Sequence, residues 1–226
     1  MRAVDLNADA GEGFDDDGVL ASVTSVNVAC GFHAGDETTM HRVCTAAAAA
    51  GVVVGAHVAY RDPEGFGRRE LDLAPHVIRV EVAEQVAALQ EMSGGRVAYV
   101  KPHGALYHRA SRDAAAAEAI IDASAPLPLL AFARSALLER ARVRGLAVFA
   151  EGFADRGYAA DGTLLPRGTH GALRAPAEAA TQAVELARGG GIDSICVHSD
   201  TDAAAAVAAA VRAALEGVGF VVRPFA

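Results

Sequence analysis

The feature that most constrains the fold is the recurrence of short apolar runs of strand length, separated by stretches with helical periodicity. The runs lie at 3–9, 25–30, 52–58, 97–103, 128–133, 147–153 and 194–200, and a final run at 220–226 is read as an eighth or a terminal edge strand. Helix-like stretches begin at Asp36, Ala74, Ser111, Arg134 and Ala175, and another follows Asp200. This alternation predicts a parallel sheet wrapped by helices.

Polar residues inside the strands decide between an open sheet and a closed barrel. Asp5, Asn7 and Asp9 alternate along the first run, so their side chains share one face of the strand. The same spacing recurs at Lys101 and His103 and at His198 and Asp200. An open sheet covered on both faces would desolvate these groups at high cost, whereas a barrel can gather them in its bore. We therefore predict one domain over residues 1–226, a seven-stranded, TIM-barrel-like parallel (β/α) barrel.

In parallel βα barrels the loops that carry chemistry emerge at the C-terminal ends of the strands. Polar residues lie at that end of nearly every run: Asp9, Glu12, Asn27, His33, His57, Lys101, His103, Glu151, Asp155, His198 and Asp200. The fifth run offers only Arg134. We therefore expect a single polar site at this rim.

Composition narrows the classes of partner. The formal charge is −8 without a cluster of basic residues, which argues against nucleic acid as a partner. No apolar run is long enough for a membrane span, and the acidic start does not resemble a secretory signal. Three cysteines without a CxxC pair fit a reducing compartment. We expect a cytoplasmic protein without a membrane partner, whose ligand is a small molecule or another protein.

Six segments together carry a family resemblance. They are DLNADAGEGF (5–14), VTSVNVACGFHAGD (23–36), GAHVAYRDPEGFGRRE (55–70), VKPHGALYH (100–108), EGFADRGYAADGTLLPR (151–167) and CVHSD (196–200). They occur in order over almost the whole chain, and together they are far more specific than any one of them. In these segments the chain resembles the LamB/YcsF family. One departure is Ser199, where the family has glycine, and it bears on the backbone geometry around Asp200.

The resemblance implies a deacetylase-like βα barrel and an activity. That activity is the hydrolysis of 5-oxo-L-proline to L-glutamate by a 5-oxoprolinase, coupled to ATP hydrolysis and carried out with two further subunits, B and C. The chain has no GxxxxGK[ST] phosphate-binding loop, so we expect ATP to be handled with the partner subunits. We also expect a partner to help activate the lactam, for example by phosphorylating its oxygen.

Opening a lactam ring needs a base that activates water, a cation or donor facing the oxyanion, and an acid for the departing nitrogen. Candidates for these roles are Asp9 or Asp200 as the base, Lys101 as the cation, and His57, His103 or His198 as the acid. Candidates for binding the substrate are Asn7, Glu12, Asn27, His33, Tyr107, Glu151 and Arg156.

Two other functions remain open at this point. A metal-dependent deacetylase or amidohydrolase could use the same barrel, with Asp9, His57 and His103 holding a divalent metal. Those three residues lie on different runs, so their spacing cannot decide. The chain could also be a non-catalytic regulatory subunit that binds a lactam while its partners do the chemistry.

Overall fold

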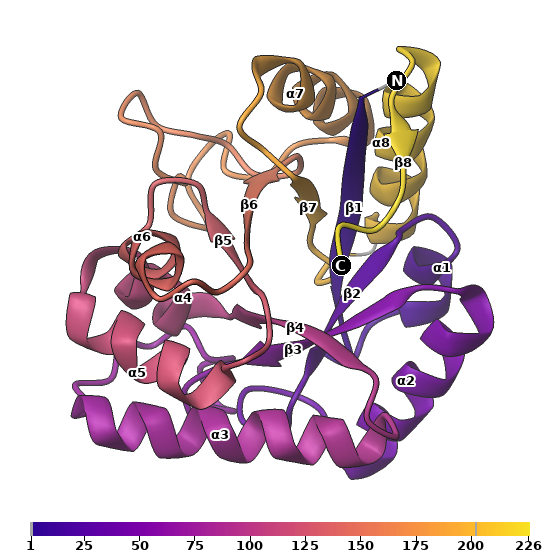
Figure 1. Ribbon diagram of the computed structural model, residues 1–226. Helices are drawn as coiled ribbons and strands as arrows, with labels where there is room; N and C mark the ends of the chain where they lie inside the picture. Colours follow the sequence, from indigo (N-terminus) through magenta and orange to yellow (C-terminus); the bar gives the residue numbers. More distant parts are fainter. Residues whose placement is uncertain (1, 202) are drawn as a thin grey trace.

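The computed structural model describes residues 2–201 and 203–226, and seven strands of this part form a closed ring. They are β1 (Ala3–Ala10), β2 (Ser25–Ala29), β3 (Val53–Val58), β4 (Val97–Pro102), β5 (Leu129–Phe132), β6 (Val148–Phe153) and β7 (Ser194–Val197). Neighbours in sequence pair in parallel, and β1 pairs with both β2 and β7, which closes the barrel (Figure 1). The predicted seven-stranded parallel barrel is confirmed. The final run contributes only β8 (Val221–Val222), which pairs with the start of β1 outside the ring.

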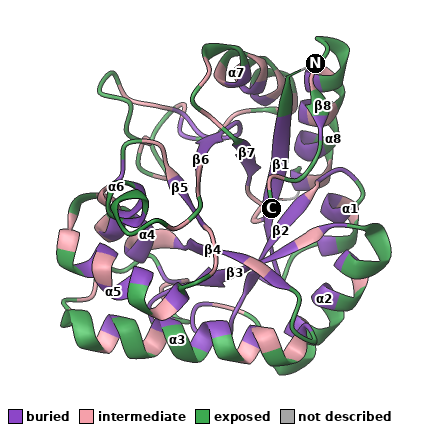
Figure 2. Ribbon diagram, viewed as in Figure 1, coloured by how far each residue is buried: buried purple, intermediate pink, exposed green. Residues whose placement is uncertain are grey.

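Helices cover the outside of the ring and turn their exposed faces to solvent (Figure 2). They are α1 (Asp16–Leu20), α2 (Glu37–Ala50), α3 (Pro75–Met92), α4 (Gly104–Arg112), α5 (Ala114–Ser124), α6 (Ala136–Val143), α7 (Pro176–Gly189) and α8 (Ala204–Gly217). Local signals set their ends, as in α2, where the Asp36 carboxylate accepts from the Thr39 N–H at 2.7 Å and Gly51 ends the helix at φ 70°. In the described residues no helix is long and apolar enough to cross a bilayer.

Two predicted elements have different bounds in the structure. The helix expected from Ser111 is preceded by α4, and Asp113 separates α4 from α5 because its carboxylate accepts from the N–H groups of Ala115 and Ala116. The seventh run stops as a strand at Val197, because the His198 N–H donates to the Asp155 carboxylate at 2.9 Å. His198 therefore lies in the loop after β7, where it is free to face the mouth of the barrel.

The lower part of the bore is filled by a polar layer. Asp5 accepts hydrogen bonds from the hydroxyls of Thr24 (2.7 Å), Ser25 (2.6 Å) and Ser194. The Phe225 ring, near the end of the chain, packs beside this layer, with its centroid 4.9 Å from that of Tyr99 and 4.3 Å from that of Phe149, and in Figure 1 the C-terminus lies beside β1 and β2. The pocket lies at the opposite, C-terminal rim, where the polar residues of the sequence were expected.

Candidate active site

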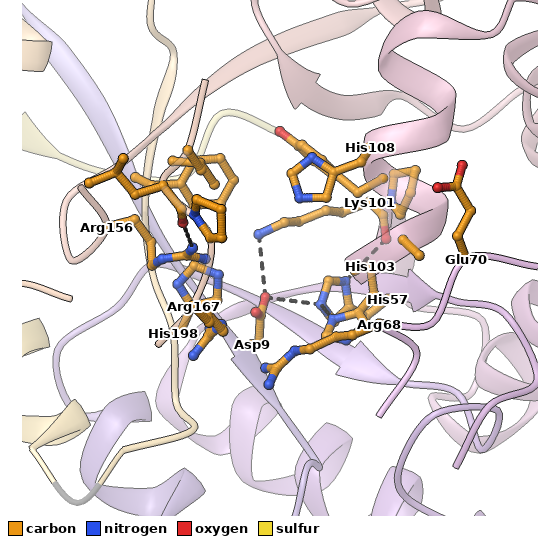
Figure 3. A pocket seen from close by; sticks show the side chains of 18 of the residues that line it. Asp9, His57, Arg68, Glu70, Lys101, His103, His108, Arg156, Arg167 and His198 are labelled. Atoms are coloured by element: carbon orange, nitrogen blue, oxygen red, sulfur yellow. Dashed lines mark hydrogen bonds and ion pairs between the residues drawn. The ribbon is translucent and has the colours of Figure 1, made fainter. Parts of the chain in front are cut away.

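A cavity of about 460 Å³ opens at the C-terminal rim of the barrel (Figure 3). Strands β1, β3 and β4 supply its floor with Asp9, His57 and Lys101, and the loops after β3 and β6 supply its walls. Its other lining residues are Arg68, Glu70, Pro102, His103, Gly104, Ala105, Tyr107, His108, Arg112, Phe153, Arg156, Leu164, Leu165, Pro166, Arg167 and His198. The volume falls within the range of roughly 300–1,000 Å³ that is usual for small-molecule sites.

Lys101 is the buried cation at the floor of this pocket. Its ammonium lies 3.3 Å from Asp9 Oδ1 and 3.0 Å from Glu151 Oε2, and it also contacts Asn7 Oδ1 at 3.3 Å. It is the single lysine of the chain, beside nineteen arginines. Burial by itself would lower the pKa of Lys101, but the carboxylate of Asp9 leads the groups that raise it well above its usual value. A fixed positive charge at this depth can stabilise an oxyanion that forms in the pocket.

Asp9 connects the lysine to a group of histidines. Its Oδ1 lies 3.2 Å from His57 Nε2, so His57 and Lys101 both point at the same carboxylate (Figure 3). Burial alone would raise the pKa of Asp9, but His57 and Lys101 outweigh burial and hold the pKa well below its ordinary value. Asp9 is therefore an anion at neutral pH.

Glu12, His33, His57 and His103 form a second cluster, the histidine cluster, beside the pocket. Each offers one nitrogen or oxygen atom, and these atoms lie within 4.8 Å of one another. Burial, followed by repulsion from Asp9, raises the pKa of Glu12 well above its usual value. Burial, followed by repulsion from His57, lowers the pKa of His33 to about 3. The surroundings thus keep the His33 ring neutral and favour a proton or a cation beside Glu12.

His198 and Asp155 form a dyad on the opposite wall. His198 Nδ1 lies 3.0 Å from Asp155 Oδ1, and its ring stacks on Phe153 with centroids 5.5 Å apart. Since the carboxylate fixes Nδ1 as a donor, Nε2 is the atom available for proton transfer. His198 lines the pocket, so this arrangement can position a general acid.

Asp200 joins two loops at the mouth of the pocket. Its Oδ2 accepts from Arg68 at 2.6 Å and from Arg167 at 2.8 Å, and these arginines come from the loops after β3 and β6. Ser199, the departure noted in the sequence, is buried with its hydroxyl unpaired among the described residues, and Asp200 still makes both ion pairs. Asp200 therefore holds the two loops together and does not line the cavity.

Known proteins share the sequence and the architecture of this chain. The LamB/YcsF family model matches residues 4–226. The chain belongs to this family. It is 48% identical to the 5-oxoprolinase A subunit of Streptomyces avermitilis, with 99% of this chain and 100% of that protein aligned. It is also 39% identical to the lactam utilization protein from Thermus thermophilus, with a TM-score of 0.90 and complete coverage of both chains.

A more distant likeness concerns the fold of this LamB/YcsF chain alone. A family 4 carbohydrate esterase from Streptomyces lividans superposes with a TM-score of 0.57 at 13% identity, covering 100% of this chain and 93% of the esterase. The deacetylase-like barrel expected from the resemblance is therefore confirmed.

The site residues predicted for this LamB/YcsF chain fall into three positions. Those lining the pocket are Asp9, His57, Lys101, His103, Tyr107, Arg156 and His198. Those buried around it are Asn7, Glu12, Asn27, His33 and Glu151, and Asp200 lies at the mouth. Asn27 donates to Asp9 Oδ1 at 2.9 Å and accepts from the Tyr99 hydroxyl at 2.7 Å, so it positions the floor from behind.

Sequence reasoning left several pocket residues out of the predicted set. His108 lies on α4, a helix that was not predicted, and although exposed it lines the cavity. Arg167 lies in a long loop without periodicity, and nothing in the sequence indicated that it would meet Asp200. Asp155 was placed at the rim, but its pairing with His198 depends on how β6 and β7 adjoin.

Proposed function

We propose that this chain is the A subunit of a 5-oxoprolinase and carries the site that opens the lactam ring of 5-oxo-L-proline to give L-glutamate. The observation that carries the proposal is the match of nearly half of all positions, over the full length, with a 5-oxoprolinase A subunit. The polar pocket supports it, because a buried lysine, an ionised carboxylate and an oriented histidine face one cavity.

Ring opening assigns a role to each of these groups. Water activated by Asp9 adds to the lactam carbonyl, and Lys101 stabilises the oxyanion that forms. His198, held by Asp155 at 3.0 Å, protonates the ring nitrogen as the C–N bond breaks. Arg156 donates to the carbonyls of Leu165 and Ala172 and lines the pocket, where its charge favours the substrate carboxylate.

ATP and two partners complete the proposal. An unstrained amide is a poor electrophile, so we assign its ATP-dependent activation to partner subunits B and C, in keeping with the missing phosphate-binding loop. If ATP transfers its γ-phosphoryl group to the lactam oxygen and leaves as ADP, water adds to the same ring carbon in the barrel and the C–N bond breaks, and hydrolysis of the resulting acyl phosphate then releases inorganic phosphate and L-glutamate.

The test is a reconstitution with candidate B and C subunits that measures glutamate and ADP formed from 5-oxoproline. Asp9→Asn and Lys101→Met should reduce turnover by at least about 100-fold. The control is Asp122→Asn, which changes an exposed carboxylate that pairs with Arg144 and should leave turnover unchanged. Near-normal turnover in both site variants would refute the assigned roles. A mixture lacking this chain that still opens the ring would show a regulatory subunit instead.

A further inference from the structure

The geometry points to a binding site for one divalent transition-metal ion in the histidine cluster of Glu12, His33, His57 and His103. All four side chains are buried, with at most 7% of any residue exposed. Three imidazoles and one carboxylate are a donor set that zinc and related ions favour.

The hydrogen bonds of two rings leave lone pairs facing each other. His57 Nδ1 lies 3.1 Å from the Lys101 carbonyl, and His103 Nε2 lies 2.9 Å from the Phe66 carbonyl. A carbonyl can only accept, so both of these nitrogens donate, and in a neutral ring the other nitrogen then carries a lone pair. Those other nitrogens, His57 Nε2 and His103 Nδ1, are only 2.9 Å apart. Two lone pairs at this distance require a proton or a cation between them.

A cation accounts for more of the cluster than a proton does. Glu12 Oε1 lies 2.9 Å from His33 Nε2, 3.6 Å from His103 Nδ1 and 3.8 Å from His57 Nε2. A neutral His33 ring can donate to Glu12 by itself, whereas the separations of 3.6 and 3.8 Å are too long for a proton to bridge. Tetrahedral ligands at about 2.0–2.1 Å from zinc lie about 3.3 Å from one another, and the four separations, 2.9 to 3.8 Å, surround that value.

Two of the rings, those of His57 and His103, are held in the way that ligating histidines usually are. Ligating histidines usually donate their second nitrogen to a carbonyl or carboxylate, which fixes the ring and its tautomer, and His57 and His103 both do so. Gly67 lets the loop after β3 bring the Phe66 carbonyl this close, because a Cβ there would lie 2.9 Å from both His103 and His33.

The place of the ion follows from which residues line the pocket. His57 and His103 line the pocket, whereas Glu12 and His33 lie behind them. Asp9, which the sequence analysis grouped with these two histidines, lies 3.2 Å from His57 Nε2 and 3.3 Å from the Lys101 ammonium, so it joins the cluster to the lysine. Four protein ligands make a closed set, so the ion would fix the pocket wall and its charge beside the floor.

The test uses the chain alone, so it is independent of the proposed 5-oxoprolinase activity. Protein treated with a chelator and then dialysed is titrated with Zn²⁺ by calorimetry and with Co²⁺ by visible absorption. We expect one ion per chain and the absorption of tetrahedral Co²⁺. Failure to take up either ion would overturn the inference, whatever the reconstituted complex does.

Variants locate the ion. Glu12→Gln and His33→Gln should each weaken binding by at least about 100-fold, because loss of a direct ligand costs no less than loss of a supporting contact. The matched control is His108→Gln, a pocket histidine outside the cluster, which should bind as the wild type does. Circular dichroism shows whether each variant is folded. If one variant does not fold, the affinity of the other variant and the wild-type Co²⁺ spectrum decide whether the histidine cluster binds the ion. Wild-type affinity in a folded cluster variant would contradict the assignment.

Discussion

Replacing Asp5 by asparagine should change how the stability of the barrel depends on pH. Burial raises the pKa of the Asp5 carboxyl from 3.8 to about 6, even though Ser194, Ser25 and Thr24 donate hydrogen bonds to it. Between these two pKa values the folded chain binds a proton that the unfolded chain does not, so the free energy of unfolding falls as the pH rises through this window. The contribution of Asp5 is thus fully present below about pH 4 and lost above about pH 6.

The size of the effect follows from the pKa shift. A difference of about two units at about 1.4 kcal/mol each gives about 3 kcal/mol. Asp5→Asn cannot ionise, so its free energy of unfolding relative to the wild type should increase by about 3 kcal/mol between about pH 4 and about pH 7. For a chain of this length that corresponds to a relative change in Tm of roughly 6–12 °C.

The measurement is urea unfolding of both proteins across this pH range, followed by circular dichroism. The other titrating groups are shared by the two proteins, so most of their contributions cancel in the difference. A difference that stays constant with pH would refute the reasoning, because it would mean that Asp5 titrates alike in the folded and unfolded chains.

Two further predictions concern the rim. Gly67→Ala should destabilise the protein in thermal unfolding by about 1–3 kcal/mol more than Gly94→Ala does. Both glycines have a similar positive φ, but only a Cβ at Gly67 would meet neighbouring atoms. Equal losses of stability would mean that this close approach is unimportant. Asp155→Asn should lower kcat of the reconstituted complex by about 10²–10⁴-fold with a smaller change in KM, because His198 loses its orientation; a change confined to KM would argue against an acid role.

The strands were predictable because a barrel strand buried on both faces is a short apolar run. All seven predicted runs contain the observed strands to within a few residues. The face of each polar residue was also predictable, since alternation along β1 sends Asp5, Asn7 and Asp9 into the bore. The depth of each residue along the bore was not predictable from the sequence. Depth is what separates Asp9, which lines the pocket, from Asn7, which lies beneath the pocket.

Pairings between distant loops could not be read from the chain. His198 and Asp155 are 43 positions apart, and Arg68 and Asp200 are 132 apart. Such contacts depend on which loops adjoin at the rim, and single-sequence periodicity carries no information about that. The sequence analysis grouped His57 and His103 with Asp9 as possible metal ligands, but it could not show that Glu12 and His33 complete a cluster with them, because the four members come from four separate segments.

The single lysine gives this protein a built-in chemical reporter. An amine-directed acylating reagent has only one side-chain target in the chain, Lys101, and that target is 2% exposed on the pocket floor. The labelling rate would therefore follow the opening of the pocket, and slower labelling with a ligand present would measure its occupancy. Mass spectrometry of one peptide, without competing lysines, would read both quantities.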